Sequence, residues 1–160
     1  MFSKSFGYAV RGVLYIAVMQ DTKRYIQAEE ISQQLTVPRH FMSKILKKLA
    51  KDGVISSIKG PAGGFTTNEK TLGIPLIEIF EKTEGLNSFN TCVLRLKECN
   101  PELPCPLHNQ MDEIRNSLSS VLVNTTIDDL LKKDKEIFLK SISSITEINL
   151  NFNGSNVKAI

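Results

Sequence analysis

Apolar residues recur at three- and four-residue steps along the first fifty positions of the chain. This pattern predicts an amphipathic helix over residues 5–19, a shorter helix over 27–35 and a third helix from Pro38 to about Asp52. Pro38 suits the first position of a helix because its missing N–H would have no partner there. Gly53 is typical of the residue that follows a helix end. Three helices joined by short turns are therefore expected in the N-terminal part of the chain.

The third predicted helix has an apolar stripe and a basic remainder, and no acidic residue in it precedes Asp52. Two helices joined by a tight turn, the second of them basic, are typical of a helix-turn-helix, which places its second helix in the major groove of DNA. A solvated helix in an ordinary bundle is the alternative. The residues expected to contact DNA are Arg39, His40, Ser43 and Lys44 at base edges and Lys47 and Lys48 at phosphates.

A short hairpin is predicted directly after the third helix. Residues 54–59 have the composition of a strand, residues 60–64 (GPAGG) that of a turn, and residues 65–67 that of the returning strand. The glycine-rich turn is not expected to bind a nucleotide, because no Gly-Lys-Ser/Thr sequence follows it. A basic hairpin after a helix-turn-helix is typical of a wing. Lys59 and Gly60 are expected to approach DNA phosphates.

The second half of the chain continues the helical pattern. A short helix is expected over residues 75–85, and Thr126 is expected to cap a further helical turn. Beyond these, residues 136–143 suggest one more short helix before a loose end from Asn149. Between them lies an apolar series of about two heptads, which favours a seam for a partner helix, with packing inside the monomer as the alternative. The seam residues are Leu107, Met111, Ile114, Leu118 and Val121.

Charge is divided unevenly along the chain. The net charge is +3, but residues 1–70 hold 11 Lys and Arg against 5 Asp and Glu, whereas residues 71–160 hold 9 against 12. The N-terminal part is therefore the part suited to a polyanion. The composition is globular, and no apolar run reaches the roughly 20 residues needed to span a bilayer. A soluble, cytoplasmic protein that does not enter a membrane is expected.

All three cysteines and one of the two histidines lie within residues 92–108, CVLRLKECNPELPCPLH. Cys92, Cys99, Cys105 and His108 have the spacing C-x6-C-x5-C-x2-H, and the three prolines among them indicate an irregular loop. Three thiolates and one imidazole make a complete four-coordinate ligand set. Soft-metal chemistry is therefore expected in this loop.

Several interpretations of the cysteine loop remain open. An odd number of cysteines, in a chain with no signal-like segment, disfavours a disulfide framework. Structural zinc would use the same residues, although its ligands usually come in closer cysteine pairs. Cysteines that merely fill space conflict with a polar, proline-broken loop. The wide spacing favours an iron–sulfur cluster. A Cys–His enzyme built on Cys105 and His108 is remote, because no acid, oxyanion loop or substrate pocket is indicated.

Over roughly residues 1–133 the chain resembles a bacterial family, the winged-helix iron–sulfur regulators of the Rrf family typified by IscR, NsrR and RirA. The resemblance rests on the first-helix sequence GYAVRGVL, the basic third helix, the wing VISSIKGPAGGF, the three ordered cysteines and the ending TTIDDLL. It implies a homodimeric transcription regulator that binds a partly palindromic DNA duplex. The state of its cluster would set its DNA affinity or its choice of sequence.

The resemblance also implies a ligand set. Cys92, Cys99 and Cys105 match the three cluster ligands, and His108 matches the fourth ligand of the IscR-like branch, which holds a 2Fe-2S cluster. In the nitric-oxide-sensing branch an acidic residue of the first helix completes a 4Fe-4S cluster instead. The corresponding position here is Tyr8, which favours His108 and 2Fe-2S over 4Fe-4S. The gap between Cys92 and Cys99 is one residue longer than is usual in the IscR-like pattern.

Together these patterns predict a mainly α-helical chain with a small β-hairpin. A winged helix-turn-helix domain is expected over residues 1–85, a cysteine-rich cluster-binding loop over 86–108, a dimerisation helix with its end cap over 109–133, and a short helix with a flexible tail over 134–160. The function expected is that of a non-enzymatic, DNA-binding transcription regulator. A winged-helix regulator that responds through zinc or bare thiols is the alternative.

Overall fold

The computed structural model describes residues 3–92, 94 and 102–132 of the chain. The described part is mostly helical, with one antiparallel pair of short strands. Residues 127–132 are also helical, and the helix expected over residues 136–143 lies outside the described residues. The elements are α1 (Lys4–Met19), α2 (Ala28–Gln34), α3 (Arg39–Lys51), β1 (Ser56–Ile58), β2 (Gly64–Thr66), η1 (Thr71–Gly73), α4 (Leu76–Glu84), η2 (Leu86–Asn90) and α5 (His108–Asn124).

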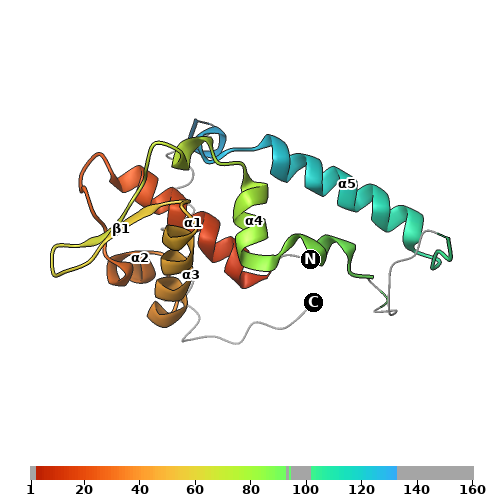
Figure 1. Ribbon diagram of the computed structural model, residues 1–160, viewed down its shortest axis with the longest axis horizontal. Helices are drawn as coiled ribbons and strands as arrows, with labels where there is room; N and C mark the ends of the chain where they lie inside the picture. Colours follow the sequence, from red (N-terminus) through yellow and green to blue (C-terminus); the bar gives the residue numbers. More distant parts are fainter. Residues whose placement is uncertain (1–2, 93, 95–101, 133–160) are drawn as a thin grey trace, which may run out of the picture.

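Figure 1 shows a body formed by α1 to α4 and the hairpin β1–β2, from which α5 extends as an arm. The C-terminal end of α5 is attached to the start of α4, because Leu76 N donates to Thr125 O at 2.9 Å and Ile127 N donates to Ile74 O at 3.2 Å. The other end of α5, which begins at His108, lies on the side of the molecule opposite the hairpin. The arm therefore separates Cys105 and His108 from the hairpin.

The core of the body lies where α1 meets α3 and α4. Ser3 is the N-cap of α1, and its hydroxyl accepts a hydrogen bond from Ser5 N at 3.0 Å. α1 and α3 approach closely at Gly12, where a Cβ atom would lie 3.3 Å from both Leu46 Cδ2 and Met42 Sδ. Met42 and Leu46 are fully buried and one helical turn apart. The apolar stripe of α3 is thus turned into the body, which leaves the basic residues on the outside.

The helices predicted over described residues are confirmed to within a few residues. Gly53, with φ 80°, follows the end of α3, and Gly85, with φ 76°, ends α4. Pro38 is the N-cap of α3 rather than its first residue. The strand predicted over residues 54–59 is shorter, because only Ser56–Ile58 pair with β2; Val54 and Ile55 precede it and are buried in the core. In the described part of the chain, no helix is both long enough and apolar enough to cross a membrane.

Candidate functional site

α2 and α3 pack against each other across a four-residue turn, residues 35–38. Leu35 and Val37 are buried, and Val37 N donates to Ser32 O at 2.9 Å. Between them Thr36 has φ 51°, a left-handed conformation that is uncommon for a β-branched residue. The two buried side chains and this hydrogen bond therefore fix the turn. The turn holds α3 in one orientation against α2, as a helix-turn-helix requires.

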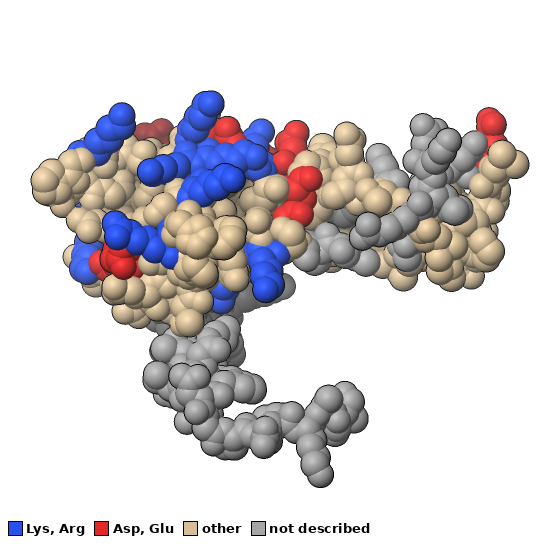
Figure 2. Space-filling view, turned by 90° about the horizontal axis from the view of Figure 1, so that it is seen from below, with Lys and Arg blue, Asp and Glu red and all other residues tan. Residues whose placement is uncertain are grey.

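The outer surface of α3 carries the residues predicted to contact DNA. In Figure 2, Lys and Arg side chains gather on the body, whereas the described surface of the arm carries few charges in this view. The α3 residues Arg39, His40, Lys44, Lys47 and Lys48 are exposed, and Ser43 is half-buried.

Phe41 also lies on this surface, and the sequence analysis did not single it out. Its side chain is 50% exposed, and its ring centroid is 4.2 Å from that of His40. An exposed apolar side chain near the start of a recognition helix can contact a thymine methyl group. The apolar pattern could not single out Phe41, because it does not separate an exposed aromatic residue from a buried one.

The hairpin presents Lys59 and Gly60 at its turn, where both are exposed. β1 pairs with β2 so that Ser57 faces Phe65, and Gly63 N closes the turn by donating to Gly60 O at 3.0 Å. The predicted wing is therefore present, with its basic residue exposed at the start of the turn.

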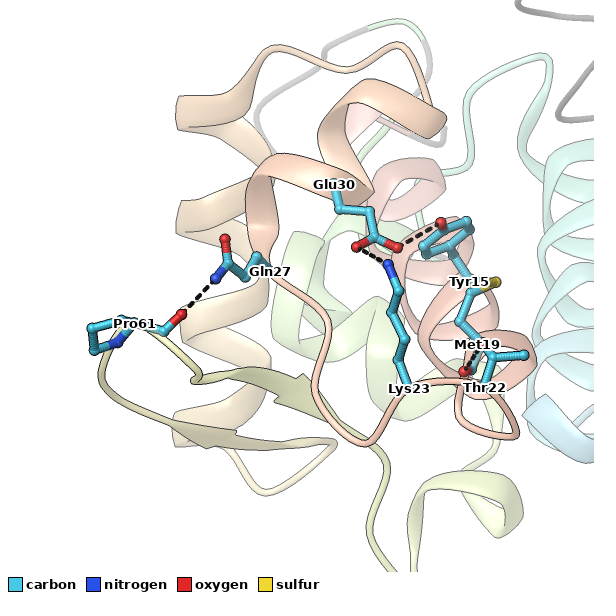
Figure 3. Close-up of polar contacts among 7 residues, drawn as sticks. All are labelled: Tyr15, Met19, Thr22, Lys23, Gln27, Glu30 and Pro61. Atoms are coloured by element: carbon cyan, nitrogen blue, oxygen red, sulfur yellow. Dashed lines mark hydrogen bonds and ion pairs between the residues drawn. The ribbon is translucent and has the colours of Figure 1, made fainter.

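The wing is attached to the segment before α2. Ile26 N donates to Phe65 O at 2.9 Å, and Phe65 N donates to Ile26 O at 2.8 Å. Nearer the tip, the Gln27 side-chain amide donates to Pro61 O at 2.9 Å (Figure 3). These contacts fix the wing relative to the helix-turn-helix, and neither was predicted from the sequence.

Polar contacts also join α1 to α2, as Figure 3 shows. The Tyr15 hydroxyl donates to Glu30 Oε1 at 3.2 Å, and Lys23 Nζ lies 2.8 Å from Glu30 Oε2. Burial, followed by the neighbouring Glu30 carboxylate, raises the pKa of Tyr15 to about 12. The phenol therefore stays protonated near neutral pH and remains a hydrogen-bond donor to α2.

Two of the predicted metal ligands lie in one turn of the chain at the start of α5. His108 is the first residue of this helix, and its N–H donates to Cys105 O at 2.9 Å, so both residues belong to one turn. Both side chains are half-buried. Cys92 is buried, with 6% of its surface exposed. Cys99 lies outside the described residues.

A hydrogen bond brings the segment before Cys92 against α5. Arg115 Nη2 donates to Thr91 O at 2.7 Å, roughly 10 Å along the helix from His108. Within residues 3–92, 94 and 102–132, no three His, Cys, Asp or Glu side chains are grouped closely enough to hold a metal ion. The donor types still fit a soft metal or an iron–sulfur cluster, because thiolates and imidazoles are the ligands that such groups take.

The predicted seam of α5 lies largely on its exposed surface. Ile114 is 48% exposed and Val121 is 58% exposed, whereas Leu122, which is not part of the seam, is buried against the body. An apolar stripe of this kind favours a protein partner. Leu122 therefore attaches α5 to the body of its own chain, whereas Ile114 and Val121 remain exposed and can contact another protein.

A helix-turn-helix with a basic second helix, followed by a wing fixed to it, defines a winged-helix DNA-binding protein. The family model of Rrf2, described as an iron-dependent transcriptional regulator, matches residues 2–133. The chain therefore belongs to the Rrf2 family of transcription regulators, which confirms the resemblance drawn from its sequence motifs.

Individual relatives agree with this assignment. A predicted HTH-type transcriptional regulator of Aquifex aeolicus is 30% identical over 141 residues, which cover 86% of this chain and 96% of the relative. The HTH-type regulator IscR of Vibrio atlanticus is 25% identical over 91% of this chain and 82% of its own length.

Solved structures confirm the predicted fold, mainly α with a small hairpin. CymR, the global cysteine regulator of B. subtilis, matches with a TM-score of 0.65 and 21% identity over 83% of this chain and 97% of its own. IscR of T. potens matches with a TM-score of 0.63 and 19% identity over 86% of this chain and 90% of its own.

Proposed function

We propose that this transcription regulator is a homodimer whose DNA affinity or sequence choice is switched by an iron–sulfur cluster. The proposed ligands are Cys92, Cys99, Cys105 and His108, and a 2Fe-2S cluster is favoured over 4Fe-4S. The observation that carries the proposal is the arrangement of the chain, in which a basic winged helix and a thiol–imidazole region lie at opposite ends of one arm. We propose no enzymatic activity.

The proposed DNA contacts follow from exposure and charge. The start of α3 projects Arg39, His40, Ser43 and Lys44 toward base edges in the major groove, because the N-terminal turns of a recognition helix reach deepest. Lys47, Lys48 and Lys59 carry positive charge on flexible, exposed stems, which suits phosphate contacts. Gly60 adds a main-chain amide with no side chain in the way.

Dimerisation is proposed through the exposed seam of α5. A partner helix would cover the apolar residues that the body leaves in water. Two copies related by a twofold axis would present two α3 helices to half-sites about 34 Å apart, and hence to a partly palindromic duplex.

The cluster is proposed at the end of α5 that lies far from the wing. The donor set fits, since thiolates and a histidine are iron–sulfur ligands, and Tyr8 offers no carboxylate from the first helix. When bound, the cluster supplies a group whose oxidation or loss changes the constraints on the segments it bridges. Because these segments flank the proposed dimer helix, a change there would alter the spacing of the two α3 helices.

A thiol- or zinc-based response is the second candidate. It is favoured by the structural likeness to CymR of B. subtilis, which is named as a global cysteine regulator. Cys105, which is half-buried, would be the more accessible of the two described thiols. Under this alternative the same dimer and winged helix would be controlled without iron.

The test is to purify the full chain without oxygen and to measure its visible spectrum, iron, sulfide and zinc. A duplex recovered by this protein from a random-sequence library then serves as the probe for binding before and after cluster removal. We expect a visible charge-transfer spectrum, iron and sulfide in equal amounts, and a change in affinity or sequence preference on removal.

Two variants sharpen this test. Cys99→Ala should lose most of its iron and sulfide, whereas Asn109→Ala, an exposed neighbour of His108 on α5, should retain both. Full iron and sulfide in Cys99→Ala would remove Cys99 from the ligand set. Stoichiometric zinc, or a metal-free protein whose DNA binding follows thiol oxidation, would establish the alternative.

A further inference from the structure

An ion pair crosses the turn of the helix-turn-helix. Arg39 Nε, in the first turn of α3, lies 2.6 Å from Glu29 Oε2 on α2. Glu29 Oε1 accepts a hydrogen bond from the Gln33 side-chain amide at 3.2 Å, so the carboxylate is also restrained from its own helix. These side chains line one shallow hollow where α2 meets the start of α3.

The two partners differ in how far they reach into solvent. Glu29 Oε2 is buried and has no aligned hydrogen-bond donor within the described part of the chain, so the Arg39 contact is Coulombic. The Arg39 side chain is 71% exposed, whereas that of Glu29 is 40% exposed. The guanidinium therefore covers the carboxylate on one side and faces outward on the other.

The Glu29–Arg39 ion pair should contribute little to the free energy of unfolding. An ion pair as exposed as this one contributes little, because solvent screens it. A cation in the first turn of a helix is also disfavoured by the helix dipole, and a carboxylate beside the DNA-contacting surface repels phosphate. The arrangement is more easily explained by an effect on Arg39 itself.

The contact through Nε determines what Arg39 can offer to a ligand. The Arg39 side chain is largely exposed, and its two terminal amino groups carry four N–H donors in a fixed plane. Such a fork matches O6 and N7 of guanine in the major groove. We propose that Glu29 is a positioning residue that holds Arg39 for bidentate contact with a guanine, and so determines part of the sequence specificity. This inference rests on the DNA-contacting role proposed for α3.

A positioning carboxylate should change affinity for DNA and discrimination between bases in opposite directions. Glu29 lowers affinity for every duplex through its charge but raises discrimination by holding the Arg39 guanidinium beside α2, which limits the positions open to the fork. Glu29→Gln, which keeps the shape and removes the charge, should therefore bind a scrambled duplex more tightly, by about fivefold or more. The same variant should lose discrimination at the guanine contacted by Arg39. A side chain that only supported the fold would not change these two quantities in opposite directions.

The experiment uses the full chain and the duplex that the parent protein recovers from a random library. Affinities are measured for this duplex, for versions with each guanine replaced, and for a scrambled duplex. Arg39→Ala should lose about 5- to 150-fold of discrimination at one guanine in each half-site. Glu29→Gln and Arg39→Lys should lose most of the same discrimination at the same position.

The matched control is Glu30→Gln. It removes the same charge from the neighbouring residue, whose carboxylate contacts Lys23 and Tyr15 instead of α3, and its discrimination at that guanine should equal that of the parent. The double variant Glu29→Gln/Arg39→Ala should discriminate no less than Arg39→Ala alone, because the carboxylate acts through the arginine.

Full discrimination in Glu29→Gln, or an equal loss of affinity for selected and scrambled duplexes, would overturn the proposal. If Glu29→Gln does not fold, Glu29→Asp decides, because it keeps the charge but withdraws the carboxylate from Arg39 by one methylene group, and full discrimination in that variant would equally overturn the proposal. Failure of the parent to enrich any sequence would instead refute the DNA-contacting role of α3, so the two failures are distinguishable.

Discussion

Ile26 and Phe65 exchange two main-chain hydrogen bonds, which makes the segment before α2 a third partner in the small sheet of the wing. The wing therefore does not depend on its own hairpin alone, which as an isolated two-stranded unit would be marginal in water. Buried Ile26 and Phe65 side chains anchor it to the core at the same point.

Gly64→Ala should test this attachment. A Cβ atom at position 64 would lie 2.6 Å from Ile26 O and 2.7 Å from its carbonyl carbon, and main-chain atoms cannot rotate away. We expect a loss of about 2 kcal/mol in the free energy of unfolding, measured by urea denaturation, and weaker DNA binding.

Gly7→Ala is the control for this substitution. Gly7 lies in α1, with no atom within 4 Å of an added Cβ, so the change should stabilise the protein by about 0.5–1 kcal/mol. Equal stability of Gly64→Ala and the parent protein would mean that the wing is not seated on Ile26 in solution.

Lys59→Ala should weaken binding to all duplexes to a similar degree. Lys59 is exposed at the wing turn, where it would contact phosphate and release counterions. The slope of log affinity against log salt should fall by roughly one unit per subunit. Lys82→Ala on α4 removes the same charge away from the wing and should leave the slope unchanged. Identical slopes for Lys59→Ala and the parent would remove Lys59 from the interface.

Much of the body could be predicted from the sequence because local rules determine it. The three- and four-residue steps of α3 predicted which residues are buried, since a helix turns one stripe toward its neighbours. Gly53 and Gly85 marked helix ends because their positive φ values suit glycine. The wing followed from a turn-forming sequence between two short β-forming segments.

The contacts that position the site could not be predicted in this way. The Glu29–Arg39 pair and the Gln27 contact with Pro61 depend on how α2 lies against α3 and the wing, which no periodicity specifies. The same reason applies to the exposure of Phe41. The cysteine spacing suggested a shared ligand role, but the described residues bring only Cys105 and His108 into one turn.

Ile114→Lys should separate the proposed dimer. A charge placed in the middle of the exposed apolar seam of α5 would be costly to bury against a partner helix. We expect a monomer in sedimentation velocity, and a loss of about 100-fold or more in affinity for a two-half-site duplex, because the second half-site is no longer tethered.

Asn116→Lys is the matched control for the seam. Residue 116 lies two positions further along α5, on the opposite side of the helix from Ile114, and its side chain is exposed. The added charge should leave both the sedimentation coefficient and the affinity close to those of the parent. A dimeric Ile114→Lys variant would place the interface elsewhere.

His108 should be the most weakly held of the four proposed cluster ligands. An imidazole in place of a fourth thiolate removes one negative charge from the ligand shell, which makes reduction easier and raises the potential. His108→Cys, reconstituted without oxygen, should therefore hold a cluster of lower reduction potential. His108→Ala should lose its cluster faster, as followed by visible absorption under air.

The chain's other histidine supplies the control for this assignment. His40 is on α3, which lies on the opposite side of the molecule from the start of α5. His40→Ala should therefore alter DNA binding but change neither the reduction potential nor the lifetime of the cluster. If His108→Cys, His108→Ala and the parent share one spectrum, potential and lifetime, His108 serves only to begin α5, and the fourth ligand must come from another element. Because His108 is the first residue of the proposed dimer helix, a true ligand there would couple cluster loss directly to the spacing of the two DNA-contacting helices.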